Sequence, residues 1–212
     1  MNSFLALLHY YHRSYMRSFR CIAPALIYFG GVSWLYAIRP NPVMPSYGFT
    51  SVLLYAVFVW LAYGFIDSEP DEQEMLTALH ARSFLKSVSA KLAYLALFAA
   101  PFALFAVAFP PLAGAFDRAV TAADLGLALA GHLLLAWLGV GTGIFFSERL
   151  FPRSSYKLPA LFLAIAVVVG AEGIRRALPV FFAPLIWLLP PVRLVMDAFI
   201  GEAESDPGMA LA

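Results

Sequence analysis

The stretch DSEPDEQEMLTALHARSFLKSVSAK, residues 67–91, lies between two long apolar runs of the chain. Five of the 13 acidic residues lie in this stretch before Met75, and three basic residues follow them: Arg82, Lys86 and Lys91. The residues on either side are almost all apolar, so the flanking runs are expected to lie in lipid. A charged, helix-competent segment between two such runs is expected to contact something in water.

The same stretch carries the signals of a helix start and of an amphipathic face. Ser68 can cap a helix, Pro70 suits its first position, and the acidic residues that follow complement the positive end of the helix dipole. Three apolar residues recur at helical spacing: Met75, Leu76 and Leu79. We therefore predict a short amphipathic helix at about 68–86 that lies outside the lipid. An ordinary solvated loop helix would have the same composition, so these residues alone leave its role open.

The composition of the 212-residue chain predicts an integral membrane protein. Hydrophobic residues make up 62% of it and charged residues 13%, with a mean hydropathy of +0.79. Soluble domains have about 45–50% apolar and about 25% charged residues. The net charge of +1 gives no basic patch that could track phosphates, so we expect no nucleic-acid partner. One cysteine, Cys21, allows neither an internal disulfide nor a cysteine-based metal site.

The apolar runs predict an all-α, polytopic membrane helix bundle. Five runs approach or reach the length that spans a bilayer: residues 21–38, 47–66, 88–109, 125–146 and 158–171. Residues 178–192 are also apolar but contain four prolines, which predicts either a short sixth span or a re-entrant pair of half-helices. The transmembrane domain thus covers residues 21–200, and a polar tail follows at 201–212.

Residues 1–20 predict a helix that lies in the plane of the membrane interface. Its apolar residues follow one helical face: Phe4, Leu8, Tyr11, Tyr15 and Phe19. Its arginines gather elsewhere: Arg13, Arg17 and Arg20. This pattern is typical of a helix whose apolar side lies in lipid and whose basic side faces anionic headgroups, so membrane lipids are expected partners. A frayed cytoplasmic tail is the alternative.

The distribution of basic residues predicts the orientation. They flank the first span and follow the second and fourth spans, whereas the intervening loops contain only Arg39 and Arg118. The positive-inside rule then places the N-terminus, the 67–91 stretch and the 147–157 loop in the cytoplasm. We therefore expect a multi-pass protein of the cell (plasma) membrane, specifically the bacterial inner membrane.

Glycines in the fourth span suggest a packing site. Gly139 and Gly143 are four residues apart, a spacing that allows close contact between two helices, and Gly141 lies between them. A local distortion that glycine tolerates would explain the same residues equally well.

Few ionisable side chains lie within the predicted spans. His132 falls about two turns into the fourth span, and a single His among Leu and Ala is more often a hydrogen-bonded interior residue than a ligand. Glu172 follows the fifth span, and Asp124 suits a helix cap, with Thr121 as the alternative. The sequence contains no metalloprotease, paired-carboxylate, Ser-His-Asp or phosphate-loop motif. We therefore predict no catalytic residue, no metal site and no cofactor bound by this chain.

The order of these segments resembles the permease subunits of type-2 ABC exporters. The shared features are an interfacial N-terminal helix, two spans, a polar helix with the sequence EQEMLTALHARSFLKSVSAK, and further paired spans. In that family the helix between the second and third spans is a coupling helix that docks on a separate ATPase subunit, and the N-terminal helix is an elbow helix. The resemblance implies a docking surface made of Glu72, Gln73, Glu74, Met75, Leu76, Leu79 and Arg82.

The resemblance also implies partners and chemistry. A second permease, identical or paralogous, would complete the pathway, and ATP and Mg²⁺ would bind only to the ABC ATPase subunit, so the permease would not itself be an enzyme. Family members have a re-entrant hairpin and then a long sixth span; residues 178–200 resemble the hairpin, and the chain would stop before the last span. Two alternatives remain: a membrane scaffold that recruits a soluble partner, or an intramembrane lipid-modifying enzyme that uses His132 or Glu172.

Overall fold

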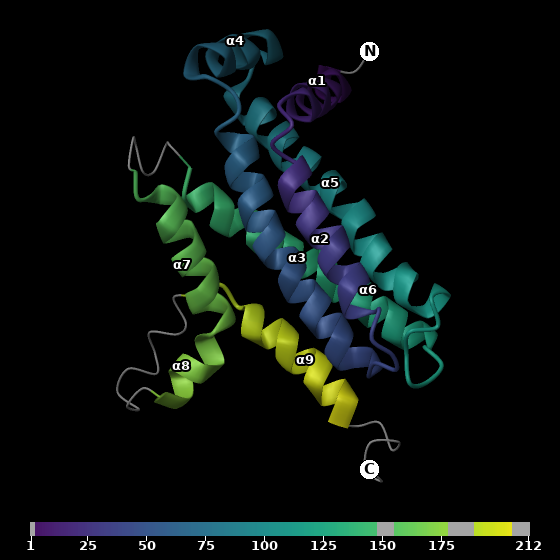
Figure 1. Cartoon of the computed structure of the whole chain (residues 1–212). Helices are drawn as coiled ribbons and strands as arrows, with labels where there is room; N and C mark the ends of the chain where they lie inside the picture. Colours follow the sequence, from purple (N-terminus) through teal and green to yellow (C-terminus); the bar gives the residue numbers. More distant parts are fainter. Residues whose placement is uncertain (1–2, 148–154, 178–188, 205–212) are drawn as a thin grey trace.

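The computed structural model describes residues 3–147, 155–177 and 189–204, which form nine α-helices and no strand. The predicted all-α class is therefore confirmed. The helices are α1 (Ser3–Arg17), α2 (Ile22–Leu35), α3 (Val43–Ile66), α4 (Asp71–Ala81), α5 (Phe84–Leu112), α6 (Ala122–Phe145), α7 (Lys157–Val169), α8 (Ala171–Ala177) and α9 (Val192–Glu204). Most of the long helices run side by side, and α1 and α4 lie together at one end of the bundle (Figure 1).

Three helices are each long and apolar enough to cross a membrane: α3, α5 and α6, with 24, 29 and 24 residues. At about 1.5 Å per residue, each exceeds the roughly 30 Å thickness of the hydrocarbon layer. Two further pairs meet the same test only jointly, and both are sharply bent: α1 with α2 by 83°, and α7 with α8 by 68°. Several apolar helices can therefore cross a membrane, three of them on their own and up to five if each bent pair counts as one span.

The predicted first span is shorter than expected, and the fifth is about as short as its apolar run. Helix α2 has 14 residues and α7 has 13, so each alone covers only about 20 Å. Residues 178–188, which the sequence assigned to a sixth span or a re-entrant hairpin, lie outside the described residues, and so do residues 148–154 and 205–212. The chain resumes at Leu189, and α9 begins at Val192.

Helix α3 is the centre of the bundle, and α6 packs closely along it. Helices α2, α5, α6, α7 and α9 all contact α3. A Cβ on Gly139 would lie 2.5 Å from the Tyr55 carbonyl oxygen, and one on Gly143 would overlap the Val59 carbonyl oxygen. A Cβ on Gly141 would meet nothing within 4 Å. The backbones of α3 and α6 therefore approach each other at the two glycines that are four residues apart, within an unbroken α6.

Helix α9 is anchored by one aromatic ring. Phe199 is buried, and its side chain lies against Gly48 of α3 and Gly131 of α6. A Cβ on Gly131 would overlap the ring of Phe199. The absence of side chains at these glycines therefore leaves room for the ring between two of the spanning helices.

The helix predicted at about 68–86 is divided into two. Helix α4 ends at Ala81, Arg82 takes a left-handed conformation with φ of 58°, and Ser83 caps the start of α5 by accepting from the Lys86 amide. Ser68 is not the cap of α4, because its hydroxyl donates to the Phe65 carbonyl at the end of α3 (2.6 Å). The expected helix was too long because the cap signal of Ser83, one residue beyond Arg82, was missed.

Candidate functional site: the surface formed by α1 and α4

The side of α4 that points away from the bundle is apolar. Met75, Leu76 and Leu79 are 67%, 56% and 68% exposed, and together we call them the α4 apolar face. They fall on one side of the helix because their positions differ by one, three and four residues. Large exposed apolar side chains that lie together mark a surface that contacts another molecule. Glu72 is exposed on the same side, two turns before Leu79.

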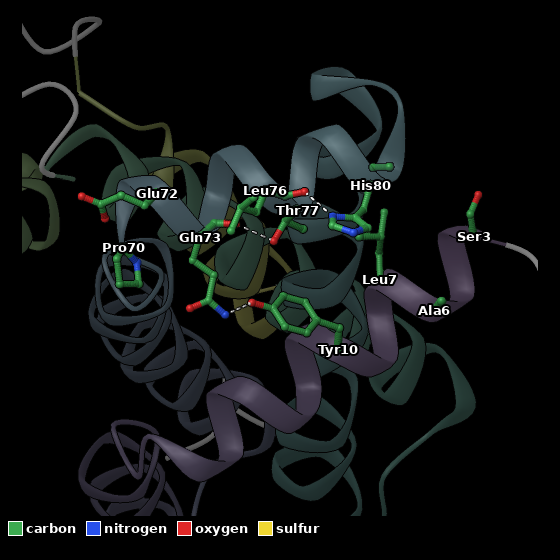
Figure 2. Close-up of a pocket in the computed structure, with 11 residues that line it drawn as sticks. Ser3, Ala6, Leu7, Tyr10, Pro70, Glu72, Gln73, Leu76, Thr77 and His80 are labelled. Carbon is green, nitrogen blue, oxygen red and sulfur yellow. Dashed lines mark hydrogen bonds between the residues drawn. The ribbon is translucent and has the colours of Figure 1, made fainter.

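A groove of about 700 Å³ runs between α4 and α1. Helix α1 contributes Ser3, Ala6, Leu7 and Tyr10, and the other wall consists of Pro70, Glu72, Gln73, Leu76, Thr77, His80 and Ala81. Figure 2 shows Tyr10 of α1 and Gln73 of α4 pointing toward each other across this space. Leu76 belongs to both the groove and the α4 apolar face, so the two form one continuous surface.

Hydrogen bonds between polar side chains join the two walls of the groove. The Gln73 amide donates to the Tyr10 hydroxyl (2.7 Å), as Figure 2 shows. Tyr10 in turn donates to Glu69 Oε1 (3.1 Å), and Thr77 donates to the same oxygen (2.8 Å). Burial and the nearby Glu69 carboxylate raise the pKa of Tyr10, so its hydroxyl remains protonated and can keep donating.

Beneath the groove, one lysine of α5 joins two carboxylates. Lys91 Nζ lies 2.8 Å from Glu69 Oε2 and 2.9 Å from Glu74 Oε1. The side chains of Lys91, Glu69 and Glu74 are 5%, 7% and 9% exposed, and we call these three residues the Lys91 triad. Glu74 therefore faces into the protein, although the sequence suggested it as part of the docking surface. It shares the inner side of α4 with Ala81, which lies about two turns further along.

The other predicted docking residues lie on the outside. Gln73 and Arg82 are exposed, as are Glu72 and the α4 apolar face. Arg82 stands at the turn between α4 and α5 rather than within a helix. Apart from Glu74, the predicted docking residues are thus all exposed, although the Gln73 side chain turns toward Tyr10 of α1.

Helix α1 packs against protein where the sequence suggested lipid. Tyr11 and Tyr15 are buried, Phe4 and Leu8 are partly buried against the core, and Phe19 is exposed. Tyr15 donates to the Leu61 carbonyl of α3 (3.1 Å). Because α1 lies across the ends of α3 and α5, much of its apolar side is buried against those two helices. Arg13 and Arg17, on the other side of the helix, are exposed.

Sequence reasoning missed the Lys91 triad. The signal was present, because Lys91 begins a long run with no other charge, KLAYLALFAAPFALFAVAF. A charge at the edge of such a run needs a partner or a route to water. Its partners lie 17 and 22 residues earlier in the chain, and no local spacing rule relates them.

The two side chains considered for catalysis have structural contacts. His132 is fully buried, its Nδ1 donates to the Ala128 carbonyl (2.7 Å), and its Nε2 lies 3.0 Å from Thr50 Oγ1. Glu172 pairs with Arg175 and Arg176 of its own helix. Within the ranges that the structure describes, no group of three or more His, Cys, Asp or Glu residues could hold a metal ion.

The N-terminal cap of α6 follows the alternative that the sequence left open. Thr121 is the cap residue and accepts from the Asp124 amide, while the Asp124 carboxylate accepts from the Thr121 amide (2.8 Å). The two residues form a capping box, so Asp124 supports the cap from within the first turn.

Comparison with known proteins gives no match: no family model fits the chain, and no curated protein or solved structure is significantly similar to it. Its function must therefore be argued from the surface of α1 and α4 and from the layout of the spans.

Proposed function

We propose that this chain is the permease subunit of an ABC-type exporter, and that a separate ATPase subunit docks on α4. The observation that carries the proposal is the α4 apolar face. Three large apolar side chains are presented to the outside by a short helix that connects two membrane-spanning helices, α3 and α5. Helix α4 has 11 residues and cannot span a membrane itself, so its exposed face is available to a soluble partner.

The surroundings of this face suit a protein partner. Burying each of these side chains would contribute about 1.5–3 kcal/mol, which makes them suitable anchors for an interface. Glu72, Gln73 and Arg82 are exposed near them and would form a polar rim. The positive-inside rule predicts that this end of the bundle faces the cytoplasm, where an ATPase subunit would be found.

The pathway would form between this chain and a second permease. The described spans contain few ionisable side chains, and the buried His132 is held by Ala128 and Thr50. A pathway lined by apolar, aromatic and small residues would favour an apolar or amphipathic substrate. ATP hydrolysis would be carried out by the partner, and this chain would convert the movement of α4 into movement of its spans.

The proposal is tested by copurification from native membranes. We expect the native chain to recover an ATPase subunit with Walker motifs, and the double variant Leu76→Asp/Leu79→Asp to lose it, because two carboxylates would replace the apolar anchors. Leu112→Asp is the matched control: Leu112 is also exposed but lies at the far end of α5. Recovery of the ATPase at equal yield with the double variant would refute docking on α4. Recovery of a different soluble protein with the native chain would favour a scaffold.

A further inference from the structure

Lys91 is the point at which three elements meet. It lies on α5, about two turns from the helix start at Phe84. Its ammonium group contacts Glu69, in the link that follows α3, and Glu74, in α4. It also lies 5.6 Å from the centre of the Tyr11 ring of α1, within the range of a cation–π interaction. Tyr11 makes a second contact with α5, since its hydroxyl lies 2.6 Å from Ser87 Oγ.

The remaining contacts of α4 with the bundle are slight. Only Glu74 and Ala81 of its 11 residues are buried, and Ala81 has a single methyl group to pack. The covalent link to α5 is a turn in which Arg82 has a left-handed backbone, a conformation that non-glycine residues adopt only at a cost. Apolar packing therefore cannot fix the position of α4. The buried ion pairs, together with the hydrogen bonds of Glu69 to Tyr10 and Thr77, must supply what packing does not.

We infer that Lys91 is a positioning residue that fastens α4 and α1 to α5, so that the three move as one rigid unit. A partner that displaces α4 would then tilt α5 instead of bending the turn at Arg82. Buried ion pairs suit this role, because they have a defined geometry and are lost at high cost when it changes. The rigid unit is a property of this chain alone, whereas its use in transmitting movement rests on the proposed function.

The rigid unit is tested on the purified chain in lipid nanodiscs, without any partner. Spin labels at Leu79→Cys on α4 and Leu97→Cys on α5, in a Cys21→Ala background, report the α4–α5 distance by double electron–electron resonance; both positions are exposed. We expect a narrow distance distribution for the parent protein and one about twofold broader for Lys91→Met, because α4 would sample several positions. Lys86→Met is the matched control, since Lys86 lies near the same end of α5 and contacts Ser3 instead of the triad.

A second variant guards against misfolding, because Lys91→Met leaves two carboxylates buried without their cation. The triple variant Glu69→Gln/Glu74→Gln/Lys91→Met replaces all three residues by neutral side chains of similar shape. Each glutamine keeps a carbonyl oxygen for hydrogen bonding. We expect this variant to keep the native thermal unfolding midpoint but to show the broad distribution. A distribution as narrow as that of the parent protein would overturn the inference.

Transmission is tested in the complex with the ATPase that the native chain recovers. Labels at Leu97→Cys on α5 and Leu134→Cys on α6 report movement between spans, and both sites are exposed. We expect MgATP with vanadate to change this distance in the parent complex. The triple variant should retain the ATPase, because its α4 apolar face is unchanged, but show no distance change; an unaltered response would refute transmission through Lys91. If the native chain recovers no ATPase, the proposed function fails, and the nanodisc measurement still decides whether the rigid unit exists.

Discussion

Two charge clusters in the part of the chain that the structure describes lie at opposite ends of the bundle, and they differ in their exposure to water. At the α4 end, Lys91 and its two glutamates are nearly inaccessible. At the other end, near α8 (Figure 1), Glu172 pairs with arginines whose side chains are 33–75% exposed: Arg175, Arg176 and Arg193. Both clusters join helices that are separate in sequence, since Arg193 belongs to α9.

The comparison shows that burial, not the number of partners, decides what an ion pair can do. Exposed ion pairs contribute little to the stability of the fold, because water and salt screen the attraction and long side chains lose conformational entropy when they are held in place. A buried pair is costly to assemble, yet breaking it leaves a charge without solvation. The Lys91 triad can therefore fix the position of α4, whereas the Glu172 cluster can only bias how α8 and α9 meet.

The largest expected effect is that of Lys91→Met. Removing the ammonium group leaves Glu69 and Glu74 buried and close together, which should destabilise the protein by about 3–5 kcal/mol. Thermal unfolding in detergent, followed by circular dichroism, measures the effect as a lower midpoint. Lys86→Met should change the midpoint far less. Equal midpoints for the two variants would mean that the Lys91 triad is hydrated and that the contrast between the two ends is false.

An intermediate case lies between the two clusters in burial. The Asp124 side chain is only 6% exposed, but its partner Arg118 is 33% exposed and pairs with it at 2.8 Å. We expect Asp124→Asn to destabilise the protein by about 1–2 kcal/mol, because it weakens both the capping box of α6 and the bidentate bond to Arg118.

The same unfolding measurement tests this value, with Asp117→Asn as the control. Asp117 is exposed in the same loop, and its replacement should leave the midpoint nearly unchanged. A loss for Asp124→Asn as large as that for Lys91→Met would show that the partner's exposure does not matter, which would weaken the comparison.

The sequence predicted the helical class well because its signals are local. Apolar run length marked α3, α5 and α6, and the spacing of Met75, Leu76 and Leu79 marked the outer side of α4. The length of α2 was overestimated, because the apolar run 21–38 continues past the end of the helix at Leu35 into a turn that hydropathy does not register.

The inner side of α4 could not be predicted in the same way. Glu72 and Glu74 are both acidic and two residues apart, yet one is exposed and the other is buried against Lys91. Their difference depends on where α5 passes beneath α4, and that depends on the turn at Arg82 and Ser83. On α1, four of the five predicted apolar residues pack against the core, and the residues that cover them come from α3 and α5, far along the chain, whereas Phe19 lies beyond the helix end and is exposed.

The smallest expected effect is that of Arg193→Met, which removes one arginine from the Glu172 cluster. Arg193 lies 3.3 Å from Glu172 and 3.8 Å from Asp197, and Glu172 keeps its contacts with Arg175 and Arg176. We expect a midpoint shift smaller than that of Asp124→Asn, and one that fades as salt is raised to about 1 M, where the screening length falls to about 3 Å. The Lys91→Met shift should persist at the same salt, because ions cannot enter a buried triad. A salt-independent shift for Arg193→Met would place the Glu172 cluster in the same class as the Lys91 triad and would remove the difference between the two ends.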